Sequence, residues 1–277
     1  MLETLDLTIR FGGHVAVNGV SCAFAPGTLT AIVGPNGAGK TTYFNLISGQ
    51  LKASAGTVSL DGQSLSGLSP SARTHAGLGR AFQLTNLFPN LTVLENVRLA
   101  VQATREGAHR RGLNLWSIWS DHKALTERAD QILADVALKS REYATVASLP
   151  HGDQRKLEVA LLMALEPKVF MFDEPTAGMN AAEAPVILDL IRKLKQDKTK
   201  TILLVEHKMD VVRELADRII VLHNGTLVAD GEPAEVIASP VVQEAYLGLP
   251  AAGAGDAPRH VTAPIPTFPR TGEGDKP

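Results

Sequence analysis

The fold of this chain is decided by the stretch Ala31-Ile32-Val33-Gly34-Pro35-Asn36-Gly37-Ala38-Gly39-Lys40-Thr41-Thr42. An apolar strand ends at Gly34, a glycine-rich loop follows, and a helical pattern runs from near Lys40 to about Ile47. The loop fills the template G-x-x-x-x-G-K-[ST], whose backbone N–H groups curl around a phosphate while the helix points its positive end at the same anion. An accidental glycine-rich turn would not need this flanking strand and helix.

The loop residues have distinct expected roles. Lys40 is expected to reach the β- and γ-phosphates of a bound nucleotide, and Thr41 is expected to ligate magnesium. ATP and Mg²⁺ are therefore the predicted cofactors. The predicted nucleotide contacts in this stretch are Asn36, Gly37, Ala38, Gly39, Lys40, Thr41 and Thr42.

Two later strands also end in polar side chains. The apolar run Val169–Phe172 ends in Asp173 and Glu174, and Thr201–Val205 ends in Glu206-His207. Because parallel strands present their carboxyl ends at one edge of a sheet, these groups are expected to face the phosphate loop. Asp173 would hold magnesium directly or through water, Glu174 would polarise the attacking water, and His207 would contact the γ-phosphate or that water. Taken alone, the paired acids could equally cap a turn.

The order of elements predicts an α/β fold, a P-loop NTPase core with a mainly parallel sheet. Its opening strands, Leu2–Ile9, Val15–Phe24 and a pair around Asp61-Gly62, predict an antiparallel β subdomain. Helical patterns at 93–103 and 124–136 predict an inserted α-helical subdomain of about 88–160, within one ATPase domain of 1–248. Further helices are expected after His151-Gly152 and at about 182–195. Residues 249–277, rich in Ala, Gly and Pro, predict a disordered tail.

Composition limits the possible partners. The chain has 29 acidic and 27 basic residues and one cysteine, Cys22. The near-zero net charge argues against nucleic acid as a partner, and a single cysteine excludes an internal disulfide framework and favours a reducing compartment. The longest apolar stretch falls well short of the roughly 20 residues that a membrane-spanning helix needs. Any role in transport would therefore require separate membrane-spanning chains.

These motifs together resemble the ABC ATPase family over about residues 1–248. The resemblance implies that the catalytic residues are Lys40, Glu174 and His207, and that magnesium is held by Thr41, Asp173 and Gln83. It also implies that Phe11 stacks on adenine, that Val17 belongs to the nucleotide site and that Gln83 senses the γ-phosphate. Without the family, Phe11 would be interpreted as a hairpin core residue and Gln83 as a solvated loop amide.

Where the family usually has Leu-Ser-Gly-Gly-Gln, this chain has the signature segment Leu149-Pro150-His151-Gly152-Asp153. The segment completes the nucleotide site of a partner subunit in this family, so the chain is expected to pair with itself or with a second ABC ATPase subunit. The missing serine hydroxyl, the missing N–H of Pro150 and the charge of Asp153 are expected to weaken that site. Asn180, where the family commonly has aspartate, puts communication across the dimer in doubt.

The relaxed signature, Glu206-His207, the insert at about 110–119 and the ending Ala245-Tyr246-Leu247-Gly248 resemble one subgroup, the importers of branched-chain and other hydrophobic amino acids. This implies a peripheral ATPase on the cytoplasmic face of the inner or plasma membrane. Its partners would be integral-membrane permease subunits and, indirectly, a periplasmic or extracellular solute-binding protein. The chain is also similar to urea and short-amide importers.

Other interpretations remain for parts of the chain. The apolar run Leu84, Leu87, Phe88 and Pro89 predicts a permease-docking groove, with core packing under the helical lobe as the alternative. A soluble ABC ATPase acting on ribosomes or DNA would commonly have two ATPase units or a long coiled coil, and neither is visible. A regulatory module without turnover is disfavoured by Glu174 and His207, and a small-molecule kinase leaves the signature segment unexplained.

Overall fold

The computed structural model describes residues 1–81, 87–104, 123–179 and 183–247. Several predictions lie outside these residues: Gln83, Leu84, Asn180, the insert at about 110–119 and the tail 249–277.

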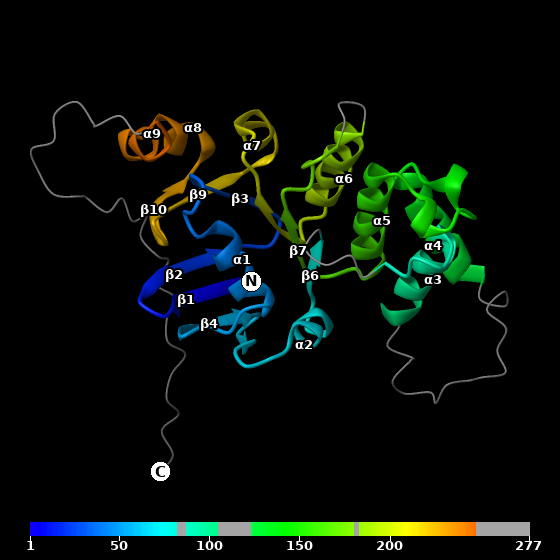
Figure 1. Cartoon of the computed structure of the whole chain (residues 1–277), viewed down its shortest axis with the longest axis horizontal. Coiled ribbons are helices and arrows are strands. Elements are labelled where there is room, and N and C mark those ends of the chain that lie inside the picture. Colours follow the sequence, from blue (N-terminus) through cyan, green and yellow to red (C-terminus); the bar gives the residue numbers. More distant parts are fainter. Residues whose placement is uncertain (82–86, 105–122, 180–182, 248–277) are drawn as a thin grey trace, which may run out of the picture.

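A six-stranded sheet forms the centre of the molecule (Figure 1), with the strand order β10-β9-β3-β8-β7-β6. Five of these strands are parallel to their neighbours, and only β10 is antiparallel. This confirms the mainly parallel sheet. In chain order the strands are β3 Leu29–Val33, β6 Leu78–Ala81, β7 Val169–Asp173, β8 Thr201–Val205, β9 Arg218–His223 and β10 Thr226–Gly231.

The three central strands are short and apolar because helices or a second sheet cover both of their faces. Along β7, Phe170 and Phe172 face one apolar cluster, whereas Val169 and Met171 face another. The first cluster is covered by α5 (His151–Ala164) and α6 (Ala184–Gln196). The second contains side chains of α1 (Lys40–Ser48) and of the antiparallel sheet.

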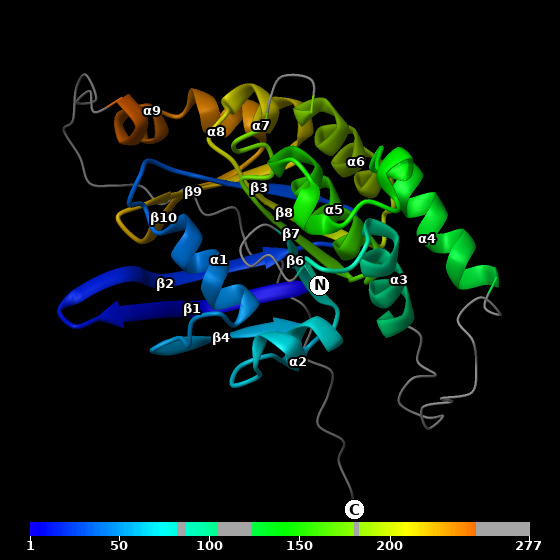
Figure 2. The same ribbon diagram turned by 45° about the vertical axis from the view of Figure 1, so that its right-hand side comes forward.

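The antiparallel sheet has the order β2-β1-β4-β5 and contains the predicted opening strands. Figure 2 shows β1, β2 and β4 on the side of the parallel sheet where α1 lies. Although Leu29–Val33 follows the opening strands directly in the sequence, it leaves this sheet, because all five of its residues are buried and suit a central parallel strand. The strands are β1 Leu2–Phe11, β2 His14–Phe24, β4 Ala55–Leu60 and β5 Gln63–Ser64.

Helices α3 (Val93–Thr104) and α4 (Lys123–Asp135) confirm the two predicted helical patterns. They pack against each other and against α5, on the far side of α5 from the sheet (Figure 1). Val97, Ala129 and Leu157 share one buried cluster across these three helices. Helix α5 also contacts β6, so it joins the helical region to the parallel sheet.

The remaining helices and turns were not predicted from periodicity. Helix α7 packs with α8 on a third apolar cluster, over β3 and β9, which includes Val33, Val212 and Val236. No helix in the described part of the chain is both long and apolar enough to cross a bilayer. These elements are α2 Pro70–His75, η2 Lys139–Arg141, η3 Val146–Ser148, α7 Met209–Leu215, α8 Pro233–Ala238 and α9 Pro240–Leu247.

Candidate functional site

The phosphate loop lies between the end of β3 and the start of α1, as predicted. Gly34 has φ +151°, and a Cβ atom there would lie 2.1 Å from the carbonyl oxygen of Leu222. Gly39 has φ +95°, and a Cβ atom there would lie 2.5 Å from the carbonyl oxygen of Ala16. Both positions therefore require glycine, because the loop is enclosed by β9 on one side and β2 on the other.

The predicted contact residues of the loop differ in their exposure. Asn36, Gly37 and Thr41 are exposed, whereas Ala38 is buried. Val17 is fully buried in β2, and its side chain lies close to Gly39 of the phosphate loop. In this conformation Val17 supports the loop, and its direct contact with a nucleotide stays a prediction.

Lys40 begins helix α1, and its ammonium group returns to the loop. Its Nζ atom donates hydrogen bonds to the carbonyl oxygens of Gly34 at 2.8 Å and Pro35 at 2.9 Å. Burial lowers the pKa of Lys40, and the negative charges of Glu174 and Asp173 oppose that shift. The lysine thus lies in the electrostatic field of both acids, as the predicted site requires.

Glu174 and His207 come from neighbouring strands, β7 and β8, and meet at the same edge of the sheet. Glu174 Oε1 accepts a hydrogen bond from His207 Nε2 at 2.7 Å, and both side chains are partly exposed. Glu174 has φ +50°, and its N–H donates to the carbonyl oxygen of Val205 at 2.9 Å.

The backbone at Glu174 is in the left-handed region, which is unusual for a residue other than glycine, and such positions recur at functional sites. The side chains predicted for water activation are therefore in direct contact. They remain accessible to a substrate at the sheet edge.

Asp173 is nearly buried and has a partner that the sequence did not reveal. Its Oδ2 atom accepts a hydrogen bond from Arg80 Nη2 at 2.8 Å, within a salt bridge. Burial raises the pKa of Asp173, and the Arg80 guanidinium opposes that shift. A charged residue in the otherwise apolar stretch Leu78–Ala81 was the available signal.

The donor set at this edge suits magnesium. The hydroxyl of Thr41 and the carboxylate of Asp173 are hard oxygen donors, and Mg²⁺ in nucleotide sites is commonly held by few protein ligands together with phosphate oxygens. Among the residues that the structure describes, no three His, Cys, Asp or Glu side chains form a metal-binding group. The protein residues thus fit a metal that arrives with its nucleotide.

Glu206 is a second residue whose role the sequence did not predict. It is 3% exposed, and its carboxylate accepts hydrogen bonds from Thr176 Oγ1 at 2.9 Å, the His207 N–H at 2.9 Å and the Lys208 N–H at 3.2 Å. The acid therefore ties the segment after β7 to the segment after β8. Its position directly after a buried apolar strand, like that of Asp173, was the available signal.

In the signature segment, Pro150 caps helix α5, which begins at His151. The sequence suggested that Asp153 brings a negative charge to the partner's nucleotide site. In the structure, two basic side chains compensate this charge. The carboxylate of Asp153 is bound by Arg141 Nε at 3.1 Å and Lys156 Nζ at 2.9 Å. Gly152 is closely covered, because a Cβ atom there would lie 2.3 Å from the carboxylate of Glu183.

Phe11, predicted to stack on adenine, lies at the end of β1 and is 50% exposed. It is therefore not a core residue of the hairpin, which was the alternative. Half of its surface is open to a ligand, and its stacking on adenine stays a prediction.

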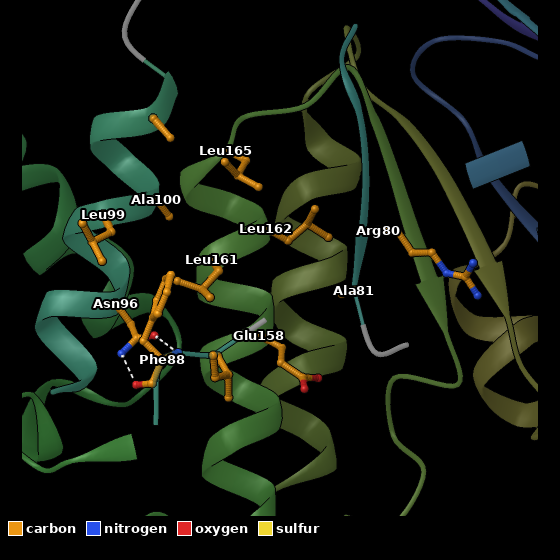
Figure 3. A pocket seen from close by; sticks show the side chains of 12 residues that line it. Arg80, Ala81, Phe88, Asn96, Leu99, Ala100, Glu158, Leu161, Leu162 and Leu165 are labelled. Atoms are coloured by element: carbon orange, nitrogen blue, oxygen red, sulfur yellow. Dashed lines mark hydrogen bonds between the residues drawn. The ribbon is translucent and has the colours of Figure 1, made fainter. Parts of the chain in front are cut away.

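A groove of about 390 Å³ lies between the end of β6 and helices α3 and α5 (Figure 3). Phe88 is 55% exposed at this groove. Leu87 lines the groove too and also packs partly against the core, so it fits both alternatives for the apolar run. Asn96 fixes Phe88 by accepting from its N–H at 2.8 Å and donating to its carbonyl at 3.1 Å. Glu158, paired with Arg155 at 3.1 Å, supplies a charged group at the groove wall.

Comparison with known proteins agrees with this geometry. The model of the family described as "ABC transporter" matches residues 17–177, and that described as "Branched-chain amino acid ATP-binding cassette transporter" matches residues 226–252. The high-affinity branched-chain amino acid transport ATP-binding protein LivG of Escherichia coli (strain K12) is 38% identical over 249 residues, which are 90% of this chain and 98% of the relative.

Solved structures give the same result. A crystal structure of an ATP-binding cassette of an ABC transporter in its ADP conformation has a TM-score of 0.73 and 31% identity, covering 90% of this chain and 99% of that chain. A dimeric ATP-binding cassette in a post-hydrolysis state with ADP and Pi has a TM-score of 0.71 and 26% identity, covering 84% and 99%. The chain belongs to the ATP-binding proteins of ABC transporters, in the subgroup of the branched-chain amino acid transport proteins.

Proposed function

We propose that this chain binds and hydrolyses ATP to power the import of branched-chain amino acids through separate permease subunits. The observation that carries the proposal is the meeting of the phosphate loop, Asp173, Glu174 and His207 at one edge of the parallel sheet. The transported solute follows from the subgroup, since its LivG member is a branched-chain amino acid transport protein.

In the proposed site, the loop binds the phosphates of ATP through its backbone N–H groups and Lys40. The exposed hydroxyl of Thr41, together with Asp173 and Gln83, would hold magnesium, which neutralises phosphate charge when it is bound. Phe11 would stack on the adenine ring. Lys40 bonds to two carbonyl oxygens of its own loop, and it can exchange those bonds for stronger ones to phosphate.

Hydrolysis requires a water molecule in line with the γ-phosphate. Glu174 would orient and polarise that water, and His207 would hold Glu174 in place while it contacts the γ-phosphate. The 2.7 Å contact between the two side chains supports this division of roles. Neither side chain is enclosed by the protein, so a closing partner subunit would be needed to exclude bulk water.

The signature segment would complete the nucleotide site of a partner ATPase subunit. The dimeric structure of the similar ATP-binding cassette supports such pairing. Pro150 has no N–H to donate there, whereas the N-terminus of α5 retains its positive end. Because Arg141 and Lys156 compensate the charge of Asp153, we expect weaker repulsion of the partner's phosphate than the sequence alone suggested. A heterodimer with unequal sites would result if the second subunit carries a full signature.

The groove beside Phe88 would receive a helix of the permease. Phe88 and Leu99 are large apolar side chains exposed at its wall, 55% and 42%, and exposed apolar patches commonly mark partner sites. Since the groove adjoins the end of β6, closure of two ATPase subunits could move the permeases docked there. A solute-binding protein would deliver the amino acid from the other side of the membrane, so the chain would work at the cytoplasmic face.

Affinity purification tests this assembly. The tagged chain is isolated from its native membranes in mild detergent, and the proteins that accompany it are identified by mass spectrometry. We expect two multi-span permeases and a second ATPase. The Phe88→Glu variant should lose the permeases and keep ATP binding, whereas Leu5→Glu, at another exposed apolar residue on β1, should lose neither. Recovery of ribosomes alone, or of no membrane partner, would overturn the transporter assignment.

A further inference from the structure

Arg80 is a buried cation that no nucleotide-binding motif includes. Its side chain is 8% exposed and lies near the end of β6, next to β7. In Figure 3 the guanidinium extends from β6 away from Glu158 and Leu161 of the docking groove. It therefore faces the interior of the molecule, where an isolated charge would be strongly unfavourable without partners.

The partners of Arg80 come from two elements of the nucleotide site. Nη2 donates to Asp173 Oδ2 at 2.8 Å, while Nη1 donates to Asn45 Oδ1 at 2.6 Å and Ser48 Oγ at 2.8 Å. The guanidinium also lies 4.9 Å from the ring centre of Phe44. Three of these residues belong to α1, the helix that begins at the phosphate loop. The arginine thus fixes Asp173 relative to that helix.

This arrangement decides how Asp173 is presented. A carboxylate at the end of a strand can rotate about its side-chain bonds, and a charge-assisted hydrogen bond from a rigid, planar guanidinium restricts that rotation. Because Arg80 engages Oδ2, and no other residue in the described part of the chain is seen to bond Asp173, Oδ1 can interact with magnesium or its water shell. On the basis of the proposed function, we propose that Arg80 is a positioning residue that orients Asp173 toward the magnesium of the bound nucleotide.

A purely structural role is the alternative, and the chain offers a matched control for it. Arg73 is also buried, and its Nη1 atom donates to the carbonyl oxygens of Leu46 at 2.8 Å and Ile47 at 2.6 Å. Like Arg80 it ties a neighbouring segment to α1, but its hydrogen bonds go to backbone oxygens and not to Asp173. Loss of Arg73 should therefore lower stability without changing the metal site.

The experiment measures metal binding separately from nucleotide binding. Binding of a fluorescent, non-hydrolysable ATP analogue by the full chain is titrated in EDTA. In a separate sample free of EDTA, with the protein in excess over the analogue, Mn²⁺ binding to the complex is followed by electron paramagnetic resonance. For Arg80→Met we expect analogue affinity in EDTA within about twofold of wild type. The Kd for Mn²⁺ should be about tenfold higher, because the freed carboxylate of Asp173 must be ordered again when it binds the metal. Arg80→Lys should be intermediate, and Arg73→Met should match wild type for Mn²⁺.

An unchanged Kd for Mn²⁺ in folded Arg80→Met would overturn the positioning role while leaving the proposed ATPase intact. If Arg80→Met does not fold, Arg80→Lys decides, because a single ammonium on a shorter group cannot reproduce the planar fork that bonds α1 and Asp173 together. A wild-type Kd for Mn²⁺ in Arg80→Lys would then overturn the proposal. Failure of the wild-type chain to bind the analogue at all would instead contradict the proposed function.

Discussion

Replacement of Glu206 by alanine should destabilise the fold. The carboxylate accepts three hydrogen bonds, and Thr176, one of its donors, is 2% exposed. Each buried donor left without an acceptor costs about 1–3 kcal/mol. His207 and Lys208 are both exposed, so their N–H groups can turn to water. The buried hydroxyl of Thr176 therefore dominates, and the expected loss is about 2–3 kcal/mol.

In a domain of this size, 1 kcal/mol corresponds to about 2–4 °C in Tm, so Glu206→Ala should lower Tm by roughly 4–12 °C. Glu206→Gln keeps the shape and one acceptor oxygen, and it should cost only about 1 kcal/mol. Scanning calorimetry on the purified chain measures both. Glu244→Ala, the same substitution at an exposed glutamate of α9, serves as the control and should stay within about 0.5 kcal/mol of wild type. A Tm for Glu206→Ala within about 2 °C of the control, against an expected loss of at least about 4 °C, would refute the hydrogen-bonding role assigned to this buried acid.

Three further results are expected. Glu174→Gln should lower kcat for ATP hydrolysis by about 10²–10⁴ while ATP binding stays within a few-fold, since it removes water activation but few binding contacts; unchanged phosphate release would exclude Glu174 as the activating group. Lys40→Ala should weaken ATP binding about 10- to 100-fold in an equilibrium titration, because a charge-assisted bond worth about 1.5–3 kcal/mol is lost; equal affinity would contradict the phosphate loop. Burial raises the pKa of the Cys22 thiol to about 11. The unfolded chain therefore loses this proton at lower pH than the folded chain, and stability should fall as pH rises from about 9 toward 11, by on the order of 2–3 kcal/mol at most. Denaturant titrations should show this fall to be smaller in Cys22→Ala, and an identical fall in both proteins would exclude the thiol as its source.

The parts of the site that were predictable from the sequence are those with a local pattern. The loop from Gly34 to Thr42 follows a fixed template, and the strands before Asp173 and His207 are short apolar runs that end in polar residues. Local chemistry determines these features, because glycine is required by backbone geometry and apolar runs by burial on both faces of the sheet.

The parts that could not be predicted depend on contacts between distant residues. Arg80 and Asp173 are 93 positions apart and meet only because β6 and β7 are neighbours in the sheet. Compensation of Asp153 by Arg141 likewise depends on the path of the chain between α4 and α5. A single charged residue has no periodicity, so its partner becomes known only when the strand order is known.

Uptake of labelled amino acids by cells measures the transport function itself. In the source organism, the chromosomal copy is replaced by wild type or by Glu174→Gln, and initial uptake rates of leucine, isoleucine, valine and urea are compared at equal protein levels. Cells with the wild-type copy should import the three amino acids, and cells with Glu174→Gln should not. Urea uptake should be the same in both. Uptake of the three amino acids that is the same with wild type and with Glu174→Gln would contradict the proposed role in branched-chain amino acid import.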